Sequence, residues 1–169
     1  MTSALEGAVA GDEVAFARIV AMYHADLLRV AYGICGDEDG ALDAVQAAWI
    51  IAWRKLRTVR EPQRLRSWLV AVAANEARHV TGRRHGPRVV EIEVDPRATD
   101  ADSVEEIARL DLVNVLRRLS PAERQLLALR YAAELDSTEI APILGVSASG
   151  VRVRLMRLMT RLRKELADG

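Results

Sequence analysis

Two segments of the chain carry apolar residues at the same helical spacing. The intervals i, i+4, i+7 and i+11 place four side chains on one face of an α-helix. These intervals are met by Val45, Trp49, Ala52 and Leu56, and again by Val151, Leu155, Leu158 and Leu162. Because each such stripe needs a partner to bury it, the sequence predicts an all-α fold of packed helices.

The chain divides into two parts at residues 86–102. This stretch has two Pro and five acidic residues and lacks a helical period, which is typical of a linker. We therefore expect a first domain over 1–85 and a second, four-helix domain over 103–169. Helices of the first domain are expected at 12–34, 38–56 and 63–82, with Gly36 and Asp37 separating the first two.

Helix-start signals recur through the second domain. A Ser or Asp followed three residues later by Glu forms a capping box, in which each side chain bonds the backbone N–H of the other residue. The pattern is met at Ser103 with Glu106, Ser120 with Glu123, and Asp136 with Glu139. We interpret Glu123 and Glu139 as structural, because each already serves as part of a cap.

The last part of the second domain predicts a helix-turn-helix. Asp136 starts a short helix, Gly145 permits a left-handed turn, and Ser147 caps a long helix that ends near Leu166. The small Ala141 lets the second helix approach the first.

Two residues break local rules within this motif. Pro142 lies inside the first helix, where it removes a hydrogen bond. Gly150 lies inside the second, where Gly costs about 1 kcal/mol relative to Ala. Both are expected to influence how the long helix is presented.

Positive charge is concentrated in that long helix. The chain has 24 basic and 24 acidic residues, yet six Lys or Arg and no acid lie between positions 152 and 164. A solvated helix with surface arginines would explain the charge alone, but not the helix, turn and second helix in register. The combination favours a polyanion as partner, with the helix in a DNA major groove.

The first domain has a weaker version of the same pattern. Trp53 and Trp68 flank a basic loop over 54–67, and basic residues beside aromatic rings suit single-stranded nucleic acid. We interpret Trp49, which lies on an apolar stripe, as a core residue.

Other protein classes find little support in the residues. Cys35 is the chain's one cysteine, and we expect it to be a small buried residue. With three His and scattered carboxylates, no base–nucleophile pair or metal-binding cluster is evident, so we expect neither an enzyme nor a bound metal or cofactor. No run of about 18 apolar residues and no secretory signal is present. A cytoplasmic protein without membrane insertion is expected.

The order of these parts resembles the extracytoplasmic-function (ECF) sigma factors of bacterial RNA polymerase. YHADLLRVAYGICGDEDGALDAVQAAWIIAWRKL is similar to the family's polymerase-binding segment, with Asp43, Val45, Gln46 and Trp49 at its motif positions. RLRSWLVAVAANEAR resembles the segment that opens the −10 promoter element, with matches at Trp68, Leu69 and Asn75. Residues 116–166 resemble the domain that reads the −35 element.

The resemblance implies a transcription initiation factor without catalytic residues, whose partners are core RNA polymerase and promoter DNA. The linker would run near the RNA exit path. Implied −35 contacts are Ser149, Arg152, Val153, Arg154 and Arg157, with Arg161 and Lys164 on phosphates. Implied −10 contacts are Trp68 and Asn75, with Arg64, Arg66 and Arg78 nearby. Implied polymerase contacts are Asp39, Asp43, Gln46 and Ile50.

The chain departs from the family pattern in its polymerase-binding segment. Acids that the family usually has are absent at positions 40, 42 and 47, which are Gly, Leu and Ala. We therefore expect core binding that is weak or assisted, because these acids normally meet a basic partner. Phosphorylation of Thr58 by a kinase would add roughly two negative charges. An anti-sigma factor is a further candidate partner.

Two other functions remain open from the residues. The first is a dimeric helix-turn-helix regulator that binds duplex DNA without polymerase. The second is a sigma-like interaction protein that has lost affinity for core polymerase.

The −10 segment also departs from the family pattern at three positions. His79 stands where the family usually has Asp, and Ala71 and Ala74 stand where it usually has basic residues. The resemblance therefore supports the −10 contacts less strongly than the −35 contacts.

Overall fold

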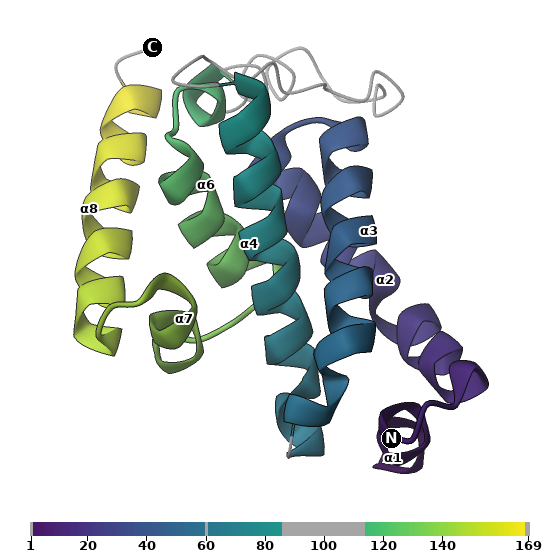
Figure 1. The fold of residues 1–169 in the computed structure, drawn as a ribbon. Helices are drawn as coiled ribbons and strands as arrows, with labels where there is room; N and C mark the ends of the chain where they lie inside the picture. Colours follow the sequence, from purple (N-terminus) through teal and green to yellow (C-terminus); the bar gives the residue numbers. More distant parts are fainter. Residues whose placement is uncertain (1, 60, 86–113, 168–169) are drawn as a thin grey trace, which may run out of the picture.

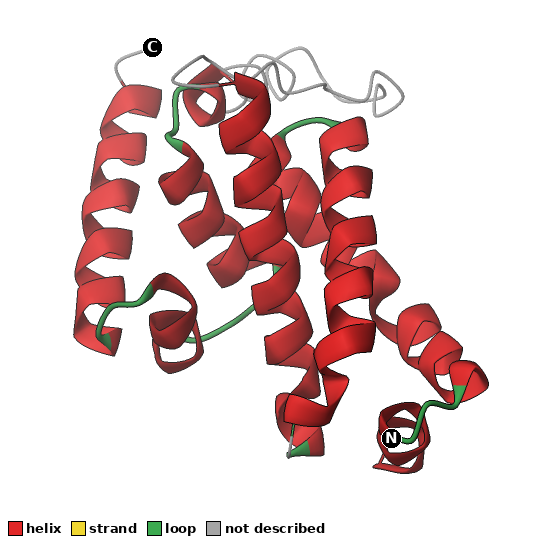
Figure 2. Ribbon diagram, in the orientation of Figure 1, coloured by secondary structure: helices red, strands yellow, loops and turns green. Residues whose placement is uncertain are grey.

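The computed structural model describes residues 2–59, 61–85 and 114–167, and these residues form helices and turns without a strand (Figures 1 and 2). The all-α prediction is thus confirmed. The elements are α1 (Thr2–Val9), α2 (Glu13–Cys35), α3 (Glu38–Lys55), η1 (Leu56–Thr58), η2 (Pro62–Arg64), α4 (Leu65–His85), α6 (Pro121–Leu127), the π-turn η3 (Ala128–Ala132), α7 (Ser137–Leu144) and α8 (Ala148–Ala167). Residues 114–117 are also helical.

Local capping residues set the helix boundaries in the first half. The Asp12 carboxylate accepts hydrogen bonds from the backbone at the start of α2. Gly36, with a left-handed φ of 80°, ends that helix, and Asp37 caps α3. The predicted boundary at Gly36 and Asp37 is confirmed. Helix α1 was not expected from the sequence, since it is a single short stretch whose Leu5 and Ala8 become buried only where it packs on α2.

Two of the three expected capping boxes are present in the second half. They join Ser120 to Glu123 at α6 and Asp136 to Glu139 at α7. The third, at Ser103 and Glu106, lies outside the described residues. So do the predicted linker over 86–102 and most of the helix expected after Ser103.

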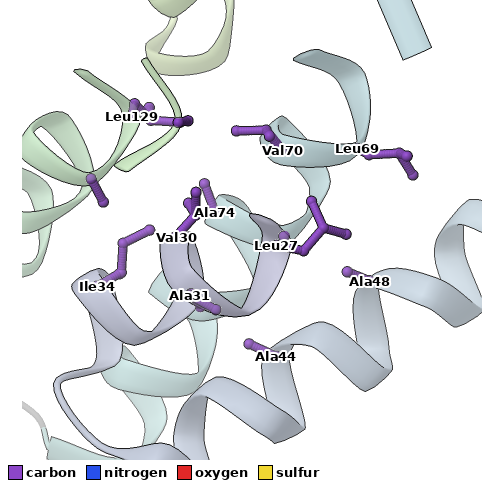
Figure 3. Packing of buried hydrophobic residues seen from close by; sticks show 14 of the residues in the cluster. Leu27, Val30, Ala31, Ile34, Ala44, Ala48, Leu69, Val70, Ala74 and Leu129 are labelled. Atoms are coloured by element: carbon purple, nitrogen blue, oxygen red, sulfur yellow. The ribbon is translucent and has the colours of Figure 1, made fainter. Parts of the chain in front are cut away.

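The buried residues of both halves form one continuous core. Leu27, Val30 and Ile34 of α2 lie among side chains of α3, α4 and η3, including Leu129 (Figure 3). Figure 1 shows α6 between α4 and α8, with α3 on the opposite side of α4. Because α4 is covered on two sides, it buries Leu65, Leu69, Val70, Ala73 and Ala74, whereas Val72 is half-buried.

Within the described residues, no helix is both long enough and apolar enough to span a membrane. Over the same residues, no group of three His, Cys, Asp or Glu side chains is arranged to hold a metal ion.

Candidate nucleic-acid and protein-binding surfaces

The long basic helix α8 is anchored by one face and exposed on the other. Val151, Leu158 and Leu162 are buried, and Leu155 is half-buried. All seven residues predicted for the −35 element are exposed, namely Ser149, Arg152, Val153, Arg154, Arg157, Arg161 and Lys164. The helix therefore presents a long basic surface while its apolar stripe holds it to the rest of the domain.

The turn before α8 has the expected geometry. Gly145 has a φ of 65°, and the Val146 N–H donates to the Ala141 carbonyl, which closes the end of α7. The Ser147 hydroxyl then accepts a hydrogen bond of 3.1 Å from the Gly150 N–H. The predicted cap and left-handed turn are confirmed, so the first turn of α8 is fixed by its own side chains.

The structure revises the interpretation of Gly150, one of the two rule-breaking residues. Gly150 lies in the first turn of α8, where a Cβ would come within 3.2 Å of the capping Ser147 hydroxyl. The cost of about 1 kcal/mol for Gly in a helix interior therefore does not apply to Gly150. The missing Cβ instead leaves room for the Ser147 hydroxyl that caps the helix. Helix α7 continues past Pro142 to Leu144, so the proline does not end it.

One predicted phosphate contact is engaged within the protein. The Arg161 guanidinium lies 2.8 Å from Glu123 and 3.5 Å from Glu165. Burial pushes the pKa of Glu123 upward, but hydrogen bonds from the Ser120 backbone and hydroxyl and from Arg161 outweigh it, so this pKa lies below its usual value. Glu123 thus caps α6, as predicted, and also pairs with α8.

Arginines predicted for the −10 element and for the −35 element line one shared hollow between α4, α6 and α8. Arg78 of α4 and Arg154 and Arg157 of α8 line a hollow of about 280 Å³, with Gln125 and Leu126 of α6. We call it the arginine hollow. Glu123 is the acidic side chain in its lining, and it already pairs with Arg161.

The other predicted −10 residues lie at the boundary with the C-terminal half. Arg64, Trp68 and Asn75 line an open hollow of about 530 Å³, and Pro142 and Ile143 of α7 line it as well. We call it the α4–α7 hollow. Asn75 Oδ1 accepts a hydrogen bond of 3.3 Å from Gln125 Nε2. Arg66 binds the Asp26 carboxylate at 3.1 Å and the Ala133 carbonyl at 3.0 Å.

The predicted polymerase contacts share one exposed face of α3. Asp39, Asp43, Gln46 and Ile50 follow each other at helical spacing and are all exposed. Beside them lies an apolar hollow of about 640 Å³ between α2 and α3, lined by Phe16, Leu42, Gln46, Trp49, Ile50 and Trp53. We call it the α2–α3 hollow. This face could accept a partner with both apolar and basic side chains.

The tryptophans are distributed differently from the sequence-based interpretation. Trp53 packs edge-on against Phe16, with ring centroids 4.8 Å apart, and lines the α2–α3 hollow, whereas Trp68 lines the α4–α7 hollow. The two rings therefore do not form one stacking surface. Trp49 is half-buried and donates to His24 Nδ1 at 3.2 Å, so it belongs partly to the core and partly to the hollow.

Three further polar residues were not singled out from the sequence. Arg29 donates to the Ala132 carbonyl at 3.2 Å, and Arg124 and Gln125 are buried. Their roles depend on how the second half packs on the first. For Arg124 and Gln125, the signal in the sequence was a pair of adjacent polar residues followed by a largely apolar segment.

Thr58, the predicted phosphorylation site, is exposed at the end of η1. Its hydroxyl donates a hydrogen bond of 2.7 Å to the Lys55 carbonyl, which caps the end of α3. The side chain also lies on the rim of the α4–α7 hollow.

Comparison with protein families gives two matches in the order expected. Residues 19–86 match sigma-70 region 2, and residues 109–162 match sigma-70 region 4.

Three curated proteins similar to this chain are described as RNA polymerase sigma factors. The probable RNA polymerase sigma factor RfaY of Xanthomonas campestris is 30% identical over 96% of this chain, which spans 43% of that protein's length. The RNA polymerase sigma-E factor of Streptomyces coelicolor is 30% identical over 92% of this chain and 88% of its own length. The ECF RNA polymerase sigma factor SigW of Bacillus subtilis is 27% identical over 94% of this chain and 92% of its own length.

Two solved structures share the fold. CnrH, in complex with the cytosolic domain of CnrY, has a TM-score of 0.70 at 23% identity and covers 98% of this chain. The sigma factor RpoE of Bartonella quintana, in complex with the anti-sigma factor NepR, has a TM-score of 0.70 at 22% identity and covers 90%.

Proposed function

The chain belongs to the ECF group of RNA polymerase sigma factors, and we propose that it directs core RNA polymerase to promoters and helps to melt them. The observation that carries the proposal is the order of region 2 and region 4, the latter ending in the exposed basic helix α8. Its place of action would be the cytoplasm, where polymerase and chromosome meet.

Helix α8 would read the −35 element from the major groove. Its first turn, fixed by the Ser147 cap, would bring Ser149, Arg152 and Val153 to base edges, since recognition helices contact bases near their N-terminus. Arg154 and Arg157 would extend this contact, and Arg161 and Lys164 would bind phosphates. The exposure of all seven side chains supports this assignment.

Helix α4 would capture the melted −10 strand. Asn75 and Trp68 would hold an unstacked base, and Arg64, Arg66 and Arg78 would bind the backbone. The proposal includes no chemical step, because a protein that binds the open strand better than the duplex shifts the population toward melted DNA.

The exposed face of α3 would bind core polymerase. Asp39 and Asp43 supply negative charge, and Gln46 and Ile50 stand at the rim of the apolar α2–α3 hollow. Leu42, which replaces a usual acid, is 43% exposed and also lines that hollow. The interface would therefore depend more on apolar contact and less on charge than is usual in the family.

Regulation would act on this weakened interface. Phosphorylation of the exposed Thr58 would add negative charge at the end of α3. The partners of CnrH and RpoE in the solved structures suggest that an anti-sigma factor also binds this chain.

The direct test is a titration of the purified, unmodified protein against core RNA polymerase at fixed moderate salt. Binding in the nanomolar range would support the sigma-factor mechanism. Absence of binding for both the unmodified and the phosphorylated protein would reject it. A footprint on palindromic DNA without polymerase would instead favour a dimeric regulator.

A further inference from the structure

We propose that the arginine hollow is a binding site for a small anion that carries two linked phosphoryl groups. The hollow has a volume of about 280 Å³, and its basic lining consists of Arg78 of α4 and Arg154 and Arg157 of α8. The inference goes beyond the proposed function, because it concerns a site on the free protein that requires neither polymerase nor DNA.

The three arginines leave an unbalanced positive charge in this hollow. In the part of the chain that the structure describes, no carboxylate forms an ion pair with Arg78, Arg154 or Arg157. The acidic side chain in the lining is Glu123, which pairs with Arg161 at 2.8 Å. Like charges that line one hollow repel each other, so an anion bound among them is stabilised.

The charge and shape of the arginine side chains favour phosphoryl groups. A phosphate monoester carries roughly 1.5–2 negative charges near neutral pH, so two linked groups come close to balancing three arginines. The planar guanidinium presents a fork of N–H donors that can bond two oxygens of one phosphoryl group. Helix α6 lies between α4 and α8 (Figure 1), so the arginines reach the hollow from two separate helices. A small anion can contact both sets of donors at once.

The remaining lining makes the hollow a site for a small molecule. Leu126 and Leu158 are buried and Leu144 is half-buried, and all three line it. Apolar side chains beside the arginines lower the local dielectric constant, which strengthens the attraction between guanidinium and anion. Ligand pockets usually have volumes of about 300–1,000 Å³, so this hollow suits a ligand at the small end of that range.

A buried acceptor in the same lining indicates what else the ligand contains. Gln125 lines the hollow and is 0% exposed. Its Nε2 donates to Asn75, but among the described residues its Oε1 has no hydrogen-bond partner. A hydroxyl or amino group of a ligand would satisfy this oxygen. Ionised phosphoryl oxygens are acceptors, so the donor must belong to an organic part. A nucleoside diphosphate or a similar metabolite therefore fits better than inorganic pyrophosphate.

Occupation of the hollow has a consequence for promoter binding. Arg154 and Arg157 are also proposed contacts to the −35 element, so a bound anion and DNA would compete for them. The chain would then bind the −35 element less tightly when the metabolite is abundant. This consequence rests on the proposed function, whereas the site itself does not.

Titration calorimetry of the purified free protein tests the site directly. Inorganic pyrophosphate, ADP and adenosine are added in magnesium-free buffer at one fixed ionic strength. We expect saturable binding of pyrophosphate and of ADP with one molecule per chain, tighter binding of ADP, and no binding of adenosine. Absence of binding by both phosphorylated probes would overturn the proposal. Equal affinity for pyrophosphate and ADP would overturn the inference of an organic ligand and assign the site to an inorganic diphosphate.

A matched pair of variants at Ala122 places the ligand in the hollow. Ala122 is exposed, lines the hollow and lies in the first turn of α6, where an acidic side chain is favourable for the helix. Ala122→Glu should lower the affinity for ADP at least about tenfold, because its carboxylate neutralises the arginines. Ala122→Gln has a similar size without the charge and should retain binding. Equal affinities in the two variants would show that the anion binds elsewhere.

Two arginine variants separate a built site from general attraction to a basic helix. Arg78→Ala should weaken ADP binding at least about tenfold, because it removes charge-assisted hydrogen bonds. Arg163→Ala removes an exposed charge of α8 that does not line the hollow and should change the affinity by less than about twofold, because solvent and salt screen it. Equal losses in both variants would reduce the binding to non-specific electrostatic association. Since polymerase and DNA are absent from these measurements, a negative result leaves the proposed function intact, and failure to bind core polymerase leaves a positive result intact.

Discussion

The Arg161 guanidinium and the Glu123 carboxylate lie 2.8 Å apart and tie helix α8 to the first turn of α6. Glu123 also accepts the Ser120 N–H at 2.9 Å, so one carboxylate serves a helix cap and an ion pair. Both partners are partly exposed, which limits the strength of the pair. The buried Val151, Leu158 and Leu162 set which face of α8 turns toward the core, and the ion pair is compatible with that orientation.

The low pKa of Glu123 predicts a pH-dependent stability of the second half. A carboxyl whose pKa is depressed on folding stabilises the folded state above its unfolded pKa, here near the ordinary value of 4.5. That contribution is lost as the pH falls through the folded pKa. Chemical unfolding of the wild type and of Glu123→Gln should therefore differ at neutral pH and converge well below pH 4.5. A difference that persists unchanged at low pH would contradict the assignment.

Two substitutions on α8 should separate base reading from phosphate binding. Arg152→Ala should cost about 1–3 kcal/mol on the preferred −35 sequence and relax specificity at one position. Lys164→Ala should weaken binding to all sequences equally. It should also reduce the slope of the logarithm of the binding constant against the logarithm of salt concentration by about one. Holoenzyme binding to a set of single-position promoter variants at two salt concentrations measures both effects. Equal losses for Arg152→Ala on every sequence would remove it from the base-reading group.

The individual helices were predictable, whereas their association was not. Apolar periodicity and caps are local signals, so α2, α3, α4 and the helix-turn-helix were found close to their bounds. Leu129 and Gln125 look like ordinary residues of one helix, yet both are 0% exposed because the first half covers them. That coverage depends on contacts far apart in the sequence, which periodicity does not encode.

The candidate sites were predictable to a similar extent. The seven α8 residues share an exposed helix, but the engagement of Arg161 with Glu123 and the closeness of Arg78 to Arg154 depend on how the helices pack. In the sequence, Trp53 and Trp68 flank the same basic loop, which suggested a shared role in binding single-stranded nucleic acid. The structure separates them, because the ring of Trp53 packs on Phe16 of α2.

A wedge at the boundary of the two halves should loosen their packing. Gly33→Val would place a branched side chain where a Cβ alone already lies 3.3 Å from Ala128. We expect faster amide hydrogen exchange in α6 and a larger radius of gyration for the free protein. Gly82→Val is the matched control, since a Cβ there meets no atom within 4 Å. An identical radius and exchange pattern in the two variants would show that Gly33 does not control the boundary.

Restoring an acid on α3 should strengthen binding to core polymerase. Leu42 is 43% exposed at a position where the family usually has an acid, so Leu42→Glu adds charge to a solvent-facing site without opening the core. Complementary charge mainly raises the association rate, and this gain falls as salt screens it. We therefore expect a several-fold faster association at low salt and a smaller gain at high salt. Leu42→Gln is the control, because it removes the same apolar surface without adding charge. If both variants bind more weakly than the wild type at low salt, the apolar contact of Leu42 in the α2–α3 hollow contributes more to this interface than the missing acid.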